Sequence, residues 1–160
     1  MRDEPSAVPA KPGSATLLND QFCFTVYAAS RAVTGAYRPL LEGAGLTYPQ
    51  YLVMLALWRN RSAAVKDLVS ALQLDYGTVT PLIKRLEANG LIKRQRRADD
   101  ERIVEVVLTP QGYAMREDLS TVPNSIGAAM GLTDEEFATA QGLLRKLTDN
   151  ITGSSGLGGN

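Results

Sequence analysis

Apolar residues recur every three or four positions along most of this chain, the spacing that places them on one face of an α-helix. The first such run starts at Ser14 and carries Leu18, Phe22, Val26, Ala29, Val33 and Ala36. Pro39 lacks a backbone donor, so we expect it to disrupt the helix, with Gly43 and Gly45 ending a short continuation. The pattern therefore predicts one long N-terminal helix.

A second helix is predicted from Thr47, because Thr47 and Gln50 have the spacing of a capping box. In a capping box, the side chain of each residue bonds the backbone N–H of the other. The apolar residues of this helix are Tyr51, Met54, Leu55 and Trp58. We expect it to end near Asn60.

The stretch from Val65 to Gly90 predicts two helices joined by a tight turn, which is the helix-turn-helix arrangement. The first helix has an apolar face made of Val65, Leu68, Val69 and Leu72. Gln73 and Leu74 form the turn, and Asp75 is a suitable N-cap for the second helix. The inward residues of the second helix are Val79, Leu82, Ile83 and Leu86.

Two runs rich in β-branched residues, LIKRQR and IVEVVLT, flank the polar segment RADDER and predict a β-hairpin. Thr109 and Pro110 then open a helix expected to reach about Met130. Thr133 and Glu136 have capping-box spacing for a last helix ending near Asn150. The predicted fold class is mainly α with a small β-hairpin wing, a winged helix-turn-helix with additional helices on either side.

Charge is clustered along the chain and balanced overall. The chain has 17 Lys plus Arg and 17 Asp plus Glu, so affinity for nucleic acid must come from local clustering. The basic cluster consists of Lys84, Arg85, Lys93, Arg94, Arg96, Arg97 and Arg102. This clustering predicts a DNA-binding face.

The composition excludes several kinds of chemistry. The chain contains no histidine, which excludes Ser-His-Asp and Cys-His catalysis and His-ligated metals. The single cysteine, Cys23, cannot form an intrachain disulfide, and no secretory signal or membrane-length apolar run is visible. We therefore expect a cytoplasmic protein that is not an enzyme and has no metal or other cofactor.

Two groups of residues are candidates for contacting DNA. The outward face of the second helix of the pair carries Tyr76, Gly77, Thr78, Thr80, Pro81, Lys84 and Arg85. Small hydroxyl side chains near a helix N-terminus allow close approach to a base edge, and Lys and Arg reach phosphates. At the hairpin tip, Arg102 can enter a narrow minor groove while Asp100 orients its guanidinium group. The alternatives are an ordinary solvated face and an ordinary charged turn.

Two interpretations of Cys23 are open from the residues alone. A lone cysteine in an apolar helix is most often a small packed hydrophobe. Tyr27 is one turn away, however, and Tyr37, fourteen residues further on, is near the same helical face. Phenolic donors aimed at sulfur favour the thiolate, the form that attacks a peroxide.

Two stretches resemble known families. The first resembles the winged-helix core of MarR-type regulators, including their Asp-x-Arg wing and Leu-Thr-Pro-x-Gly strand end; it consists of LDYGTVTPLIKRLEANGLIKRQRRADDER and VLTPQG. The second resembles the N-terminal half of the organic hydroperoxide resistance regulators, a redox-sensing branch of that family; it is NDQFCFTVYAASRAVTGAYRPLLEGAGLTYPQYLVMLALW. This resemblance implies a homodimeric repressor that binds a palindromic operator in double-stranded DNA and is released by organic hydroperoxides.

The resemblance also implies roles for individual residues. Cys23 is the oxidised cysteine, Tyr37 and Tyr48 of the opposing subunit hydrogen-bond its sulfur, and Tyr27 lies nearby on its own helix. With no second cysteine, the chain resembles the one-cysteine kind. Its oxidised state is then a mixed disulfide with a low-molecular-weight thiol, a cyclic sulfenamide or an over-oxidised cysteine, and these stay open.

Further expectations concern the oxidant, the operator and the division of the chain. The hydroperoxide is expected to enter an apolar site around Phe22, Phe24 and Trp58. Tyr76, where this family is expected to have a small hydroxyl residue, affects base preference.

The expected segments are a disordered tail (1–13), dimerisation and sensor helices (14–46), a DNA-binding lobe (47–110), C-terminal dimerisation helices (111–152) and a flexible tail (153–160).

Three other functions are compatible with the sequence. The first is a MarR-type regulator that answers a small phenolic or lipophilic ligand, with Cys23 packed as a structural residue. The second is a thiol peroxidase, which would turn over many times per cysteine. The third is a winged helix used only for protein contact, which would not bind an operator.

Overall fold

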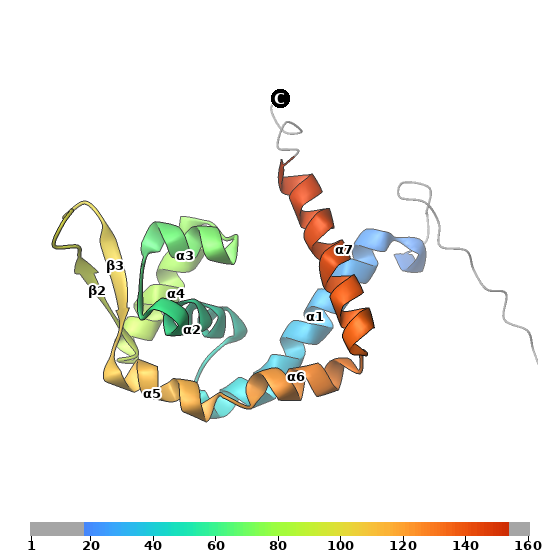
Figure 1. Ribbon diagram of the computed structural model, residues 1–160, viewed down its shortest axis with the longest axis horizontal. Helices are drawn as coiled ribbons and strands as arrows, with labels where there is room; N and C mark the ends of the chain where they lie inside the picture. The colour runs from blue at the N-terminus through green and yellow to red at the C-terminus, as the bar shows by residue number, and fades with distance from the viewer. Residues whose placement is uncertain (1–17, 154–160) are drawn as a thin grey trace, which may run out of the picture. The chain divides into compact units, whose positions relative to one another are not determined.

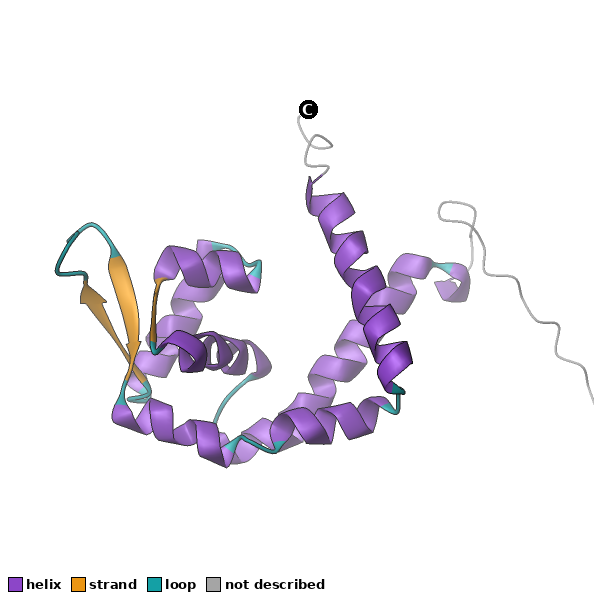
Figure 2. Ribbon diagram, viewed as in Figure 1, coloured by secondary structure: helices purple, strands orange, loops and turns teal. Residues whose placement is uncertain are grey.

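The computed structural model describes residues 18–153. The expected N-terminal tail, the expected helix start at Ser14 and residues 154–160 of the expected C-terminal tail lie outside the described residues. The described part contains seven α-helices, two short 3-10 helices and a three-stranded sheet (Figures 1 and 2). The predicted fold class, mainly α with a β-hairpin wing, is confirmed. The chain divides into two compact units between Val122 and Pro123.

The first unit begins with helices and contains the whole sheet. Its elements in chain order are η1 (Leu18–Asp20), α1 (Phe22–Leu41), η2 (Glu42–Ala44), α2 (Tyr48–Asn60), β1 (Ser62–Ala64), α3 (Val65–Leu72), α4 (Tyr76–Ala88), β2 (Ile92–Arg96), β3 (Val104–Leu108) and α5 (Pro110–Asp118).

The first long helix differs from its prediction at both ends. Gln21 is extended (φ −79°, ψ 111°) and separates η1 from α1, so the expectation of one continuous helix is wrong in this region. At the other end, α1 passes through Pro39 to Leu41. Pro39 lies in the last turn, where its missing N–H costs only the bond to the carbonyl of Gly35.

Local capping signals define α2 and α4 as predicted. Thr47 and Gln50 form the reciprocal capping box at the start of α2, with N–H···O distances of 2.9 and 3.4 Å. Asp75 caps α4 by accepting from the backbone N–H of Thr78 at 2.8 Å. After α4, Gly90 adopts the left-handed conformation (φ 75°), which glycine reaches without steric cost. These caps fix the start of α2 and both ends of α4.

The sheet has the order β1-β3-β2, and both pairings are antiparallel. The predicted hairpin is confirmed as β2 and β3, with Arg96 opposite Val104 at the end next to the tip. Strand β1 was not predicted. Its three residues, Ser-Ala-Ala, have no β-branched or aromatic side chain, and the strand forms because Ser62 and Ala64 pair with Val107 and Glu105 of β3.

The core of the first unit lies among α2, α3, α4 and the sheet, which Figure 1 shows grouped together. Three of the four predicted inward residues of α4, namely Val79, Ile83 and Leu86, are fully buried, whereas Leu82 is half-buried. From α2, the indole N–H of Trp58 donates to the carbonyl of Gly112 at 2.8 Å. This buried bond connects α2 to α5.

The helix predicted from Pro110 to about Met130 is interrupted, so that expectation is wrong. The structure has α5, then a break at residues 119–121, then α6 (Val122–Met130). Pro123 has no N–H to donate to the carbonyl of Leu119, and proline is best tolerated in the first turn of a helix. A new helix therefore begins one residue before it.

The second unit contains most of α6 and all of α7 (Asp134–Gly153). The predicted capping box at its start is confirmed, because Thr133 N–H donates to Glu136 at 2.8 Å and Glu136 N–H donates to Thr133 at 3.3 Å. Helix α7 ends three residues beyond the expected Asn150. It has no buried residue and exposes the apolar side chains of Phe137, Leu143, Leu144 and Ile151.

Candidate DNA interface and redox-sensor residues

Helix α4 places the predicted recognition residues on its outer face. Lys84 and Arg85 are exposed, and in the described part of the chain neither forms an ion pair. Pro81 is exposed inside the helix and removes one backbone bond without ending it. The hydroxyl of Thr78 donates to Asp75 at 3.0 Å, so its proton is engaged in the cap.

A hollow of about 400 Å³ lies between α4, the start of α3 and the hairpin. Its polar and charged lining consists of Lys66, Tyr76, Thr80, Arg94 and Arg102. We call it the α4–wing hollow. Every charged side chain in that lining is a cation, so this concave surface suits a polyanion.

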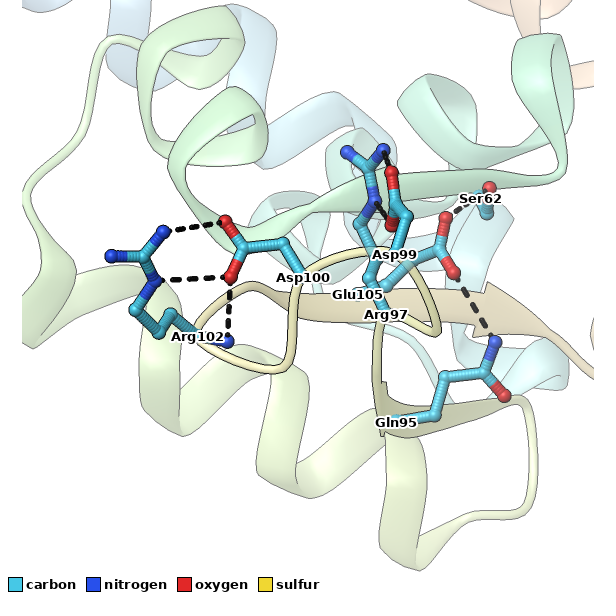
Figure 3. Close-up of polar contacts among 7 residues, drawn as sticks. All are labelled: Ser62, Gln95, Arg97, Asp99, Asp100, Arg102 and Glu105. Carbon is cyan, nitrogen blue, oxygen red and sulfur yellow. Dashed lines mark hydrogen bonds and ion pairs between the residues drawn. The ribbon is translucent and has the colours of Figure 1, made fainter.

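The wing tip holds two arginines against two aspartates (Figure 3). Arg102 donates to Asp100 through its backbone N–H and Nε, each at 3.1 Å, and through Nη2 at 3.4 Å. Arg97 donates to Asp99 through Nε at 2.9 Å. The Arg102 side chain is nevertheless 91% exposed, whereas that of Arg97 is 40% exposed. Asp100 therefore orients Arg102 while leaving it accessible, which is the geometry predicted for this pair.

These contacts stabilise the charged forms of both aspartates. The side-chain bonds from Arg102 lower the pKa of Asp100, with help from its backbone N–H and the positive charges of Arg97 and Lys66. The side-chain bonds from Arg97 likewise lower the pKa of Asp99. Both carboxylates therefore stay ionised at and well below neutral pH, and the wing keeps its arrangement there.

Side-chain bonds also connect the strands behind the wing tip. Glu105 of β3 accepts from Ser62 of β1 at 3.0 Å and from Gln95 of β2 at 3.2 Å (Figure 3). Arg94 donates to Glu87 of α4 at 2.8 Å, so part of its charge is neutralised within the chain. One carboxylate thus joins all three strands, and another joins the hairpin to α4.

Lys66 is the functional candidate that the sequence did not reveal. It is exposed at the start of α3, lines the α4–wing hollow, and is close enough to Asp100 to influence its pKa. The charge cluster found in the sequence runs from residue 84 to residue 102, so a cation contributed by an earlier helix fell outside it. Within VKDL, Lys66 stands alone between the apolar Val65 and the acidic Asp67, so no local cluster of positive charge marked it.

Cys23 lies in the first turn of α1 and is exposed. Tyr27, one turn further along, is also exposed, and its hydroxyl accepts from Arg31 Nη1 at 3.2 Å. The guanidinium carbon of Arg31 also lies 5.6 Å from the Tyr27 ring centroid. Cys23 is therefore not a packed core residue within the chain, and the oxygen of Tyr27 is engaged with Arg31.

Tyr37 and Tyr48 meet near the other end of α1. Their ring centroids are 4.4 Å apart, and Tyr51 lies 5.8 Å from Tyr37. Burial raises the pKa of each of these three phenols. They are therefore neutral at physiological pH and keep a hydroxyl proton to donate.

One chain does not bring Cys23 to these tyrosines. Fourteen residues of helix separate Cys23 from Tyr37, a rise of about 21 Å. The apolar site expected around Phe22, Phe24 and Trp58 is also wrong for one chain, because Trp58 is buried against Tyr51 and Gly112 in the core of the first unit. Phe22 is instead exposed.

A second hollow, of about 640 Å³, lies along α1, η2 and the start of α2. Arg31, Arg38, Glu42, Thr47 and Tyr48 contribute its polar lining. We call it the α1–α2 hollow. In the described residues, no helix is long and apolar enough to cross a membrane, and no three His, Cys, Asp or Glu side chains gather as a metal site.

Comparison with known proteins agrees with this geometry. Residues 36–119 match the family described as transcriptional regulator SarA/Rot. The chain is 42% identical to the HTH-type transcriptional regulator TtmR of Methylorubrum extorquens, covering 87% of this chain and 71% of that protein. It is 39% identical to the organic hydroperoxide resistance transcriptional regulator of Bacillus subtilis, covering 84% of this chain and 91% of the other.

Solved structures of AbfR from Staphylococcus epidermidis are also similar. Reduced AbfR bound to DNA is 33% identical with a TM-score of 0.70, covering 84% of this chain and 94% of AbfR. Over-oxidised AbfR has also been solved bound to DNA (34% identity, TM-score 0.70), and a disulfide-formed AbfR has a TM-score of 0.61. The chain therefore belongs to the SarA/Rot family of winged-helix transcriptional regulators, which are DNA-binding proteins close to the MarR type.

Proposed function

We propose that this regulator is a homodimeric cytoplasmic repressor that leaves its operator when organic hydroperoxides oxidise Cys23. The observation that carries the proposal is an exposed Cys23 in the first turn of α1, in a chain that presents a winged-helix DNA face. The name of the Bacillus subtilis relative supports the choice of oxidant.

In the reduced state, two copies present their α4 helices to successive major grooves of a palindromic operator, about one helical turn apart. Lys84 and Arg85 contact phosphates, and Thr78, Thr80 and Pro81 face the groove. Arg102, oriented by Asp100, enters the adjacent minor groove. The exposed apolar side chains of α7, together with the N-terminal helices, pair the two copies, and light scattering in solution tests this pairing.

The sensor is completed by the second copy. Tyr37 and Tyr48 of one copy hydrogen-bond Cys23 of the other and favour its thiolate, since they stay neutral donors at physiological pH. Tyr27 lies beside the sulfur on the same helix. This arrangement accounts for the exposure of Cys23 within one chain and for its distance from the tyrosine cluster.

Oxidation proceeds by attack of the thiolate on one peroxide oxygen. The O–O bond breaks, sulfur becomes sulfenic acid, and the other oxygen leaves as the alcohol after taking a proton. A low-molecular-weight thiol then condenses with the sulfenic acid, releasing water and forming a mixed disulfide. Over-oxidised AbfR was found bound to DNA, which favours the bulkier mixed disulfide over added oxygen as the releasing form.

Release requires only modest coupling between the two sites. A coupling of about 1–3 kcal/mol changes affinity about 5- to 150-fold. The mixed disulfide adds bulk where the copies meet, breaks the tyrosine contacts and changes the half-site spacing of the two α4 helices.

We expect Arg102→Ala to weaken binding to an operator duplex about tenfold and to lower the salt slope by about one. Arg97→Ala is the matched control, because it removes the same charge from the same wing and also leaves an aspartate unpaired. Arg97 is less exposed and held by Asp99, so we expect about a twofold loss or less. Equal losses in fluorescence-anisotropy titrations at several salt concentrations would contradict the proposed role of the wing tip.

A second candidate function is a response to a small anionic or phenolic ligand. The observation that favours it is the α1–α2 hollow, which places Arg31 and Arg38 beside Thr47 and Tyr48. Titration of the reduced protein–DNA complex with aromatic carboxylates and phenols distinguishes the ligand response from the redox response. If these compounds release DNA without oxidant, and also release it from Cys23→Ser, the ligand response is favoured.

A further inference from the structure

Tyr76 is a large exposed aromatic side chain on the proposed DNA interface. It is the first residue of α4, follows the N-cap Asp75, and is 55% exposed. Among the described residues, its side chain forms no hydrogen bond, ion pair or ring contact. Packing within the chain therefore does not explain a tyrosine at this position.

The surroundings of Tyr76 are those of a nucleic-acid contact. It lines the α4–wing hollow together with Thr80, one turn further along α4, and with the cations Lys66 and Arg102. These cations lie on elements on either side of α4, where they suit the phosphates of a bound duplex. Tyr76 itself belongs to the first turn of α4, and first-turn side chains of a recognition helix reach base edges in the major groove.

We propose that Tyr76 is a specificity-determining residue that reads a thymine in each half-site. Its ring edge contacts the C5-methyl group of the thymine, and its hydroxyl hydrogen-bonds a neighbouring base edge. In the major groove, the thymine methyl is the apolar group that distinguishes this base, and an aromatic side chain is a suitable partner for it. The inference rests on the proposed DNA interface and adds to it the base that one residue selects.

Tyr76 is better suited to reading a base than its neighbours on α4. The Thr78 hydroxyl donates its hydrogen bond to Asp75, and Lys84 and Arg85 are exposed charges suited to phosphates. At Gly77, an added Cβ would lie 3.0 Å from the Asp75 carboxylate, so a side chain there would crowd the N-cap and not contribute freely to the DNA face.

The test begins with selection of bound duplexes from a random library by the full-length reduced protein, by Tyr76→Phe and by Tyr76→Ala. Because Tyr76 is exposed and unpacked, both variants should fold like wild-type protein, which circular dichroism checks. We expect the wild-type protein to select thymine at one position of each half-site. We expect Tyr76→Ala to lose that preference while keeping the other positions and the salt slope.

Single thymine-to-uracil replacements in the selected duplex then isolate the methyl group. At the position read by Tyr76, removal of one contacted methyl should weaken wild-type binding about fourfold. The same replacement should not affect Tyr76→Ala, and Tyr76→Phe should keep the sensitivity to uracil. Uracil at the other thymines of the duplex is the internal control.

Three results would overturn the inference. The first is an unchanged base preference in Tyr76→Ala. The second is equal weakening on all sequences, which would make Tyr76 a phosphate contact without base preference. The third is equal sensitivity to uracil in wild-type protein and Tyr76→Ala. If the proposed DNA interface as a whole were wrong, the result would be different, because Arg102→Ala would then also bind DNA like wild-type protein.

Discussion

The Cys23→Ser variant is expected to bind the operator as tightly as wild-type protein and to stay bound after treatment with an organic hydroperoxide. Serine has nearly the same shape as cysteine, and Cys23 is exposed, so the substitution should leave the fold unchanged. Its hydroxyl does not form a sulfenic acid or a mixed disulfide. Titrations of labelled duplex with cumene hydroperoxide and a small thiol should therefore show release of wild-type protein only.

Methionine oxidation is the main competing reaction. Met115 and Met130 are partly exposed, and sulfoxide formation there would act equally on both proteins. Release of Cys23→Ser at the same oxidant concentration as wild-type protein would therefore place the response outside Cys23. Mass spectrometry of the treated proteins identifies which sulfur has reacted.

Gly112→Ala is expected to lower the free energy of unfolding by about 3 kcal/mol or more, a large part of the stability of a typical domain. A Cβ at Gly112 would lie 2.0 Å from the carbonyl oxygen of Leu91. That carbonyl is held in place because it accepts from Thr109 N–H at 3.1 Å. Movement of Gly112 would in turn strain the buried bond from Trp58.

Urea unfolding followed by circular dichroism measures this effect. Gly127→Ala is the matched control, since no atom lies within 4 Å of the added Cβ and the residue is inside α6. Alanine there should be neutral or slightly stabilising. A Gly112→Ala protein as stable as Gly127→Ala would show that the close approach of α5 to Leu91 does not constrain the fold.

The helix pair was predictable because its signals are local. Asp75 and Gly90 mark the ends of α4, and the apolar residues between them are spaced so that they lie on one face of a helix. The break between α5 and α6 was missed because Leu119, Val122 and Ile126 continue the helical spacing across it. Pro123 was the signal that outweighed this pattern.

Features that depend on distant partners could not be predicted in the same way. Strand β1 exists because β3 offers it an edge, and its own residues have little preference for a strand. Lys66 joins the α4–wing hollow, the candidate DNA interface, because the fold brings α3 beside the wing. Asp100 and Arg102, by contrast, are two residues apart in one turn, so their pairing could be predicted.

The sensor residues show a similar limit. Cys23 and Tyr27 share one face of α1 by spacing alone, but Tyr37 lies about four helical turns from Cys23 and packs on Tyr48 and Tyr51. Helical periodicity shows which residues share a face of a helix, but residues at opposite ends of a long helix remain far apart. In the proposed sensor, the contact between the Cys23 sulfur and these phenols therefore requires a second copy of the chain.

The measurement that tests the central claim most directly is an electrophoretic mobility shift on the DNA upstream of the protein's own gene. It is run at fixed salt with reductant, then with one equivalent of organic hydroperoxide plus a small thiol, and then with reductant again. We predict binding, loss of binding and recovery, in that order. Binding that is indifferent to the oxidant would contradict the proposed redox control and leave a DNA-binding regulator of another kind.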